Sequence, residues 1–128
     1  MRGMPDTCGV KRVLVVDDSS IVARQLTKIL EESGRYQVMG HAPDGFSAVK
    51  RFKEENPDIV CLDVVMPNLD GIQALRLIRQ VRANAVVVMI SSMAGVADKV
   101  AECLKAGATS VVQKPFDAKR VLEVLDAV

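Results

Sequence analysis

The sequence predicts an α/β protein with one parallel sheet of five strands and five helices that cover both faces of the sheet. Short apolar runs alternate with amphipathic stretches from about Lys11 to the end of the chain, which is the pattern of strand–helix units on a parallel sheet. Most of these runs are continuously apolar, as expected of central strands that helices bury on both faces. No internal repeat, low-complexity segment or interdomain linker interrupts the pattern.

The five apolar runs are the predicted strands. They are VLVV (13–16), YQVMG (36–40), IVCL (59–62), AVVVMI (85–90) and SVV (110–112). The second run has mixed polarity, which suits a strand at the edge of the sheet.

The first predicted helix, at residues 21–32, follows the first strand. Ser19 or Ser20 can cap its start, because a serine hydroxyl accepts a hydrogen bond from a free N–H of the first turn. Gly34 stops this helix, and Gly107 stops the fourth one. The other four helices are expected near residues 45–55, 71–81, 96–105 and 117–127.

Length and composition favour one domain. The chain has 128 residues, of which 49% are hydrophobic, enough for a sizeable core. We expect residues 1–10 to form a flexible tail and residues 11–128 to form the domain. The net charge of +1 does not favour nucleic-acid binding or membrane anchoring. No apolar run approaches the roughly 20 residues of a membrane helix, and no signal peptide is evident, so we expect a cytoplasmic protein.

The three cysteines, Cys8, Cys61 and Cys103, are odd in number and lack the spacing of metal ligands. A disulfide framework or a zinc site is therefore not expected. We interpret them as core or incidental thiols.

Polar residues follow four of the five strands. In open parallel sheets, binding sites form outside the carboxyl ends of the strands, so residues from distant segments should meet at one rim. The residues concerned are Asp17, Asp18, Asp63, Ser91, Ser92 and Lys114.

The adjacent carboxylates Asp17 and Asp18 have two interpretations. Either could cap the first helix, since aspartate is a preferred capping residue. A cap needs one such residue, however, and with Asp63 three carboxylates would converge and repel unless a cation lay between them. Oxygen ligands without histidine or cysteine favour Mg²⁺, which often shares its site with a phosphate.

Lys114 and the two serines also have ordinary alternatives. A lysine before a turn is usually exposed, and Ser91 or Ser92 could simply cap the fourth helix. Pro115 keeps Lys114 out of the helical region, so that its side chain could point along the rim. There it would balance the charge of a bound phosphoryl group.

Four segments in order resemble the receiver domain of two-component response regulators, especially the single-domain chemotaxis type. They are VLVVDDSS, PDIVCLDVVMPNLDGI, VVVMISSM and LKAGATSVVQKPF, and the resemblance covers about Lys11 to the C-terminus. It implies a flavodoxin-like doubly wound sheet with strand order 2-1-3-4-5.

The resemblance also implies roles for individual residues. Asp63 would be the phosphoacceptor, Asp18 a direct Mg²⁺ ligand and Asp17 a ligand through water. The backbone carbonyl of Val65 would complete the metal site, and Lys114 would contact the acyl phosphate.

Ser91, which lies 28 positions after Asp63, would be the hydroxyl that moves toward the phosphoryl group. Ser92 would be the small residue beside the phosphoryl entrance.

Further positions follow from the same resemblance. Val65 and Met93 would flank the path of the hydrolytic water. Val111 stands where the family commonly has an aromatic residue, and the bond between Lys114 and Pro115 is expected to be cis.

As a receiver, the protein would not be a conventional enzyme, but would catalyse its own phosphorylation and dephosphorylation on Asp63. A sensor histidine kinase or phosphotransfer protein would be the donor. Phosphorylation would switch the surface of the fourth helix, fifth strand and fifth helix toward a downstream protein target. Neither nucleic acid nor a membrane is an expected partner of this domain.

Other classes of protein fit the sequence less well. Phosphatases of the haloacid dehalogenase kind have D-x-D, but Ser19 occupies the second position, and no G-x-G-x-x-G indicates a dinucleotide site. His41 fits a structural or solvated side chain better than a phosphodonor. Two alternatives stay open: a receiver-fold interaction module that is not phosphorylated, and the receiver part of a longer regulator. Residues 108–110 lack the acidic pair of winged-helix regulators, which slightly favours a stand-alone protein.

Overall fold

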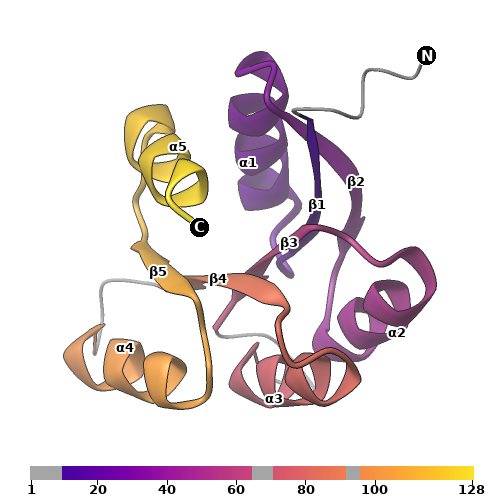
Figure 1. Ribbon diagram of the computed structural model, residues 1–128. Helices are drawn as coiled ribbons and strands as arrows, with labels where there is room; N and C mark the ends of the chain where they lie inside the picture. Colours follow the sequence, from indigo (N-terminus) through magenta and orange to yellow (C-terminus); the bar gives the residue numbers. More distant parts are fainter. Residues whose placement is uncertain (1–9, 65–70, 92–95) are drawn as a thin grey trace.

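Strands and helices alternate along the whole domain (Figure 1). The computed structural model describes residues 10–64, 71–91 and 96–128. The elements are β1 (Lys11–Val16), α1 (Ser20–Glu32), β2 (Tyr36–Ala42), α2 (Gly45–Glu55), β3 (Ile59–Asp63), α3 (Gly71–Val81), β4 (Val86–Ser91), α4 (Val96–Lys105), β5 (Ser110–Gln113) and α5 (Ala118–Asp126). The predicted α/β class is confirmed.

All five strands are parallel, and their order is β2-β1-β3-β4-β5. This confirms the order implied by the family resemblance. Compared with the apolar runs, β1 begins two residues earlier and β4 one residue later. The strands β2, β3, β4 and β5 each end one or two residues later than their runs, because backbone pairing continues to the point where the chain leaves the sheet. β3 thus includes Asp63, and β4 ends at Ser91.

The helix predictions need small corrections. Ser19, and not Ser20, caps α1, since its side chain accepts a hydrogen bond from the N–H of Val22. The fifth helix is one residue shorter at each end than predicted, because Asp117 is its cap and accepts from the N–H of Arg120. The expected tail lies outside the described residues, except for Val10.

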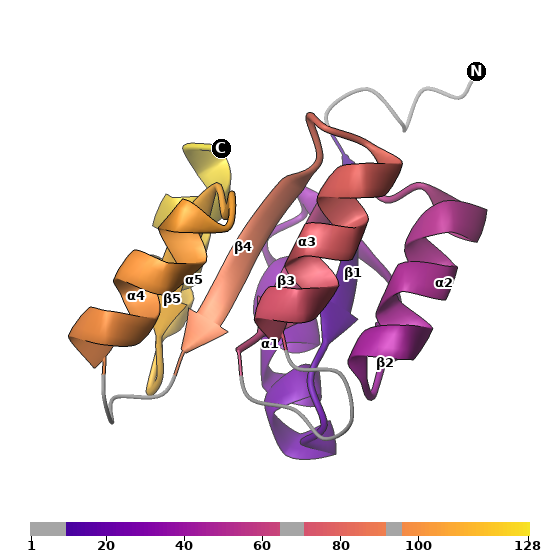
Figure 2. The same cartoon turned by 90° about the horizontal axis from the view of Figure 1, so that it is seen from below.

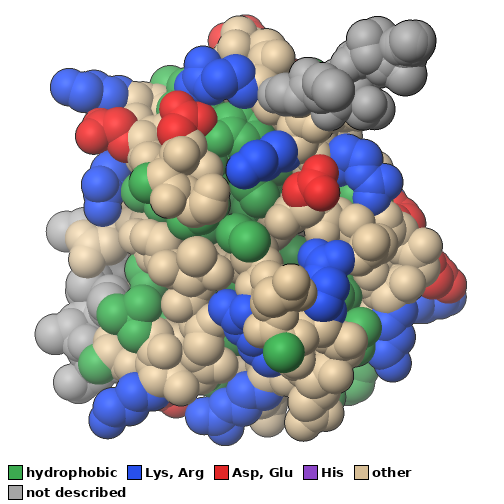
Figure 3. All heavy atoms as spheres, in the orientation of Figure 1, with side chains coloured by type: hydrophobic (Ala, Val, Ile, Leu, Met, Phe, Trp, Pro, Cys, Tyr) green, Lys and Arg blue, Asp and Glu red, His purple; other side chains and the backbone are tan. Residues whose placement is uncertain are grey.

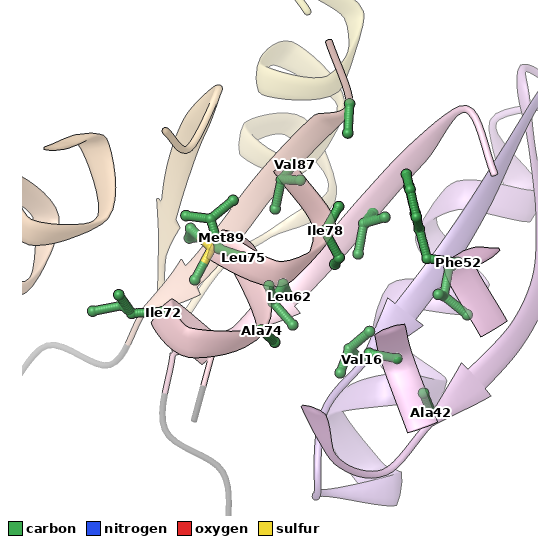
Figure 4. Close-up of a cluster of buried hydrophobic side chains, with 14 of the residues drawn as sticks. Val16, Ala42, Phe52, Leu62, Ile72, Ala74, Leu75, Ile78, Val87 and Met89 are labelled. Carbon is green, nitrogen blue, oxygen red and sulfur yellow. The ribbon is translucent and has the colours of Figure 1, made fainter. Parts of the chain in front are cut away.

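Two apolar clusters fill the space on either side of the sheet. Helices α2, α3 and α4 lie side by side on one face, and α1 and α5 cover the other (Figures 1 and 2). In the first cluster, Leu75 and Ile78 of α3 pack with Leu62 and Met89 of the central strands (Figure 4). The sheet is therefore a rigid platform for the residues at its carboxyl end.

Two of the three cysteines lie in the described part of the chain, in the core. Cys61 and Cys103 are both buried, and burial raises the pKa of the Cys61 thiol to about 12, whereas Cys8 lies outside the described residues. Acidic and basic side chains both occur on the face shown in Figure 3. None of the helices described is long and apolar enough to cross a membrane.

A hydrogen-bonded group ties the end of α5 to the start of β2. The hydroxyl of Tyr36 donates to Oδ1 of Asp126 at 2.5 Å, and Nη2 of Arg35 lies 2.8 Å from Oδ2. The hydrogen bond from Tyr36 and then that from Arg35 lower the pKa of the Asp126 carboxyl. Segments about 90 residues apart in sequence are thereby joined.

The start of α3 packs directly against the end of β3 at Gly71. The N–H of Gly71 donates to the carbonyl of Val64 at 2.9 Å. A Cβ at this position would overlap the carbonyl oxygen of Asp63 and lie 2.8 Å from Cα of Val64. Glycine is therefore required by close backbone approach.

We predict that Tyr36→Phe lowers the free energy of unfolding by about 1 kcal/mol at pH 7, the usual contribution of one hydrogen bond. A lowered pKa in the folded state means that ionised Asp126 adds stability above its ordinary pKa of about 3.9 and loses that stability as pH falls through and below it. The difference between wild type and variant in urea unfolding should shrink between about pH 5 and pH 3. An equal difference at both pH values, or an equal effect in an Asp126→Asn background, would contradict this coupling.

We predict that Gly71→Ala destabilises the fold by about 2–3 kcal/mol, since backbone must shift to admit the methyl group. Gly34→Ala is the matched control. Gly34 has φ +77°, but, its chain neighbours aside, no atom of the described residues lies within 4 Å of the position that a methyl group would take, so that variant should lose only about 1 kcal/mol to backbone strain. Unfolding by denaturant measures both. A Gly71→Ala protein as stable as Gly34→Ala would refute the close-approach argument.

Candidate functional site

Four neighbouring strands bring the predicted polar residues to one rim. Asp17 directly follows β1, Asp63 ends β3, Ser91 ends β4 and Lys114 directly follows β5. Because these strands are adjacent in the sheet, their carboxyl ends meet.

Three carboxylates converge at this rim. One oxygen from each of Asp17, Asp18 and Asp63 lies within 4.8 Å of the other two. Asp17 is 1% exposed and Asp63 5% exposed, whereas Asp18 is open to solvent. Like charges so close and so little hydrated repel strongly unless a cation compensates them.

Asp17 does not cap α1, although its sequence position allowed that role. Its Oδ1 accepts from the N–H of Ser19 at 2.8 Å, while the hydroxyl of Ser19 supplies the cap. Its Oδ2 is buried and has no hydrogen-bond partner among the described residues. A buried carboxylate oxygen in this position is suited to a cation or a cation-bound water.

Lys114 supplies positive charge inside the rim. Its Nζ lies 3.4 Å from Oδ2 of Asp17 and 3.5 Å from Oδ1 of Asp63. Lys114 and Asp17 thus form an ion pair without the geometry of a hydrogen bond, which agrees with the lack of a hydrogen-bond partner for Oδ2 of Asp17 among the described residues. The peptide bond to Pro115 is cis, which confirms the expectation from the resemblance.

Ser91 ends β4, the strand that lies next to β3 and its terminal Asp63. Asp63 pairs with Ile90 in the sheet, and the N–H of Val64 donates to the carbonyl of Ile90 at 3.0 Å. Ser91 directly follows Ile90, so it lies close to the end of β3. Its side chain is buried, and its carbonyl accepts from the N–H of Lys114 at 2.6 Å. The ends of β4 and β5 are therefore joined through two predicted site residues.

Three predicted site residues, Val65, Ser92 and Met93, lie outside the described residues. Val111 is partly buried and packs against the apolar cluster on the α2, α3 and α4 side.

His41 makes a contact with the site that was not predicted from the sequence. Its Nε2 lies 2.6 Å from the backbone carbonyl of Asp17, a distance that fits donation by the ring N–H. The contact depends on a register shift between Val13 and Leu14 in the pairing of β1 with β2. Such a bulge leaves no clear mark in a single sequence, although the edge position of the second strand was evident.

The residues present fit a magnesium site. They offer several carboxylate oxygens and no histidine or cysteine ligand, and one buried oxygen has no hydrogen bond. Lys114 contacts two of these carboxylates, and the third, on Asp18, is open to solvent.

Comparisons with known proteins agree with this geometry. A family model described as the response regulator receiver domain matches residues 13–126. Chemotaxis protein CheY of Bacillus subtilis is 40% identical over 115 residues, covering 90% of this chain and 94% of that protein. Chemotaxis protein CheY of Thermotoga maritima is 42% identical over 118 residues, covering 92% and 97%.

Solved structures show the same likeness. A chain in the crystal structure of the CheX–CheY–BeF3–Mg²⁺ complex from Borrelia burgdorferi has a TM-score of 0.82 and 39% identity, with 97% of this chain and 96% of that chain covered. CheY4 of Vibrio cholerae has a TM-score of 0.84 and 27% identity, with 93% and 98% covered. The fold, the acidic rim and these likenesses place the chain in the family of response regulator receiver domains, the phosphoacceptors of two-component signalling.

Proposed function

We propose that Asp63 accepts a phosphoryl group from a histidine kinase or a phosphotransfer protein in a Mg²⁺-dependent reaction. The observation that carries this proposal is the position of Lys114, whose Nζ lies within 3.5 Å of carboxylates from β1 and β3. A lysine there can contact an anionic group on Asp63 and still neutralise Asp17. We also expect the protein to act in the cytoplasm.

Asp17, Asp18, Asp63 and the carbonyl of Val65 would hold the metal ion. When bound, Mg²⁺ supplies positive charge that stabilises the negative charge on the transferring phosphoryl oxygens. The relative crystallised with CheX, BeF3 and Mg²⁺ supports this assignment.

The chain's own residues would position and stabilise the transfer. A carboxylate oxygen of Asp63 attacks phosphorus, so that a new P–O bond forms while the P–N bond of the donor's phosphohistidine breaks. The electron pair of that bond leaves with the donor imidazole. Lys114 balances charge on the phosphoryl oxygens, and the buried setting of Asp63 strengthens this interaction.

The response would pass from the site to the surface formed by α4, β5 and α5. A phosphoryl group reaches farther from the backbone than a carboxylate and would accept a hydrogen bond from Ser91. The hydrogen bond between the carbonyl of Ser91 and the N–H of Lys114 couples that movement to β5. Since Val111 replaces the common aromatic residue, the change would depend on backbone and loop movement.

Two other functions were compatible with the sequence: an interaction module that is not phosphorylated, and the receiver part of a longer regulator. An interaction module without phosphorylation would have no need for Lys114 between two carboxylates, so the geometry does not favour it. The receiver could also be part of a longer regulator, with the same chemistry at Asp63.

We predict that incubation with acetyl phosphate and Mg²⁺ adds one phosphoryl group, measured as the intact mass of the protein. Asp63→Asn should abolish the adduct because the nucleophilic carboxylate is lost, and chelation of Mg²⁺ should reduce it strongly. Glu32→Gln, which neutralises an exposed carboxylate on α1, is the matched control and should behave as wild type. A stoichiometric adduct on Asp63→Asn would refute the assignment.

We also predict a long-lived phosphoryl group. Val65 and Met93 are apolar and cannot orient a water molecule by hydrogen bonding, and the flexible Met93 side chain is long enough to cover the phosphoryl face. The double variant Val65→Asn with Met93→Glu should shorten the lifetime of phosphorylated Asp63 after the donor is removed. The conservative pair Val65→Ile with Met93→Leu should change it little. If the polar pair left the lifetime unchanged or lengthened it, other residues would control hydrolysis.

A further inference from the structure

The two edge strands of the sheet, β2 and β5, differ in how far side chains cover their outward backbone groups. At β2 these groups are covered. The outward N–H of Val38 donates to Oε2 of Glu31 at 3.3 Å. Arg51 donates to the carbonyls of Met39 and His41, both at 3.4 Å. Side chains from α1 and α2 therefore cover the backbone groups of this edge, a known means of preventing strand addition.

Arg51 is held in that position by its surroundings. Its guanidinium also pairs with Glu55, with Nε 2.8 Å from Oε2 and Nη2 3.0 Å from Oε1. Gly40 has no side chain in the space that the Arg51 guanidinium occupies, and a Cβ at position 40 would overlap the guanidinium.

The edge at β5 lacks a comparable cover. All four residues of β5 lie in register with β4, and the N–H of Lys114 donates to the carbonyl of Ser91 in that strand, so the backbone groups of Val112 and Ser110, two and four residues earlier, also face β4. Because alternate residues of a strand direct their backbone groups to opposite sides, those of Val111 and Gln113 point away from the sheet. Across the described part of the chain, no loop, turn or side chain forms a hydrogen bond with them.

A pocket of about 420 Å³ lies along this open edge. Its described lining consists of Val111, Gln113, Pro115 and Arg120. β5 stands at the end of the sheet between α4 and α5 (Figure 1). Arg120 is exposed, and no described carboxylate lies within ion-pair distance of its guanidinium. The edge thus offers backbone hydrogen bonds, an apolar contact and one uncompensated positive charge.

We propose that the free edge of β5 binds an extended, acidic segment of a partner protein, which adds to the sheet as a sixth strand. The segment's backbone would pair with Val111 and Gln113, and one of its carboxylates would contact Arg120. This docking site deepens the proposed function, because it specifies the chemistry of the partner that binds the surface of α4, β5 and α5. The regulation of this binding by phosphorylation rests on the proposed function.

An extended segment fits this edge better than the other occupants. A helix uses its own backbone groups internally and cannot satisfy those of Val111 and Gln113. A second copy of the chain would bring a second Arg120 and no carboxylate from the described lining. Two strands of four residues would also make a small contact for a stable dimer.

The test uses the full chain and a synthetic probe, acetyl-Thr-Val-Glu-Val-Glu-Thr-amide. In ¹H–¹⁵N NMR titration, we expect the amide signals of Val111 and Gln113 to shift more than those of Ser110 and Val112, which already face β4. Gln113→Pro should bind about tenfold more weakly than Gln113→Thr, because one backbone donor is lost, and proline is tolerated where the missing N–H faces solvent. Arg120→Gln should also weaken binding.

A probe methylated on its backbone nitrogens should not bind, and this result does not depend on how any variant folds. The proposal would be overturned if Gln113→Pro bound like Gln113→Thr, if the methylated probe bound equally well, or if the edge signals shifted with protein concentration alone, since a second copy would then be the occupant.

Binding of the probe should tighten after the protein is treated with acetyl phosphate and Mg²⁺. Intact mass reports the phosphoryl adduct separately, so a failed adduct with normal probe binding contradicts only the function at Asp63, and an adduct without probe binding contradicts only the docking site.

Discussion

Repulsion among Asp17, Asp18 and Asp63 is the constraint on which the rest of the site depends. Two of these carboxylates are almost fully buried, where unpaired charge is costly. Lys114 contacts both buried carboxylates at ion-pair distance but leaves Oδ2 of Asp17 without a hydrogen bond. The site is thus only partly compensated by the protein, and a divalent cation together with a phosphoryl group would complete its charge balance.

The fold makes this unfavourable cluster possible. Central strands with apolar residues on both faces fix the backbone behind each carboxylate, and the close approach at Gly71 holds α3 against the end of β3. His41 binds the carbonyl of Asp17 from the next strand. At the opposite end of the sheet, Tyr36 and Asp126 join β2 to α5. Stability from the core therefore offsets local strain at the rim, as is common for functional sites.

Much of this arrangement could be predicted from sequence. Alternating apolar and amphipathic runs predicted each element, and the rule that strand ends meet at one rim predicted the cluster of Asp17, Asp63 and Lys114. Contacts set by tertiary geometry could not be predicted. The bulge that brings His41 to Asp17 and the choice of Ser19 as the cap depend on backbone details, and the covering of the β2 edge by Arg51 depends on how α2 packs. The roles expected of Val65, Ser92 and Met93 rest on the family resemblance.

Carboxylate repulsion is tested most directly by the midpoint of thermal unfolding for wild type and Asp18→Asn, each measured with a chelator and with increasing Mg²⁺. Without metal, Asp18→Asn should unfold at a higher temperature than wild type, because one of three converging charges is removed. With Mg²⁺, the wild-type midpoint should rise with concentration, as expected when a ligand binds only the folded state, and the variant should respond much less. A wild type that is more stable than Asp18→Asn in chelator, or an equal response of both proteins to Mg²⁺, would contradict the assignment of these carboxylates to a metal site.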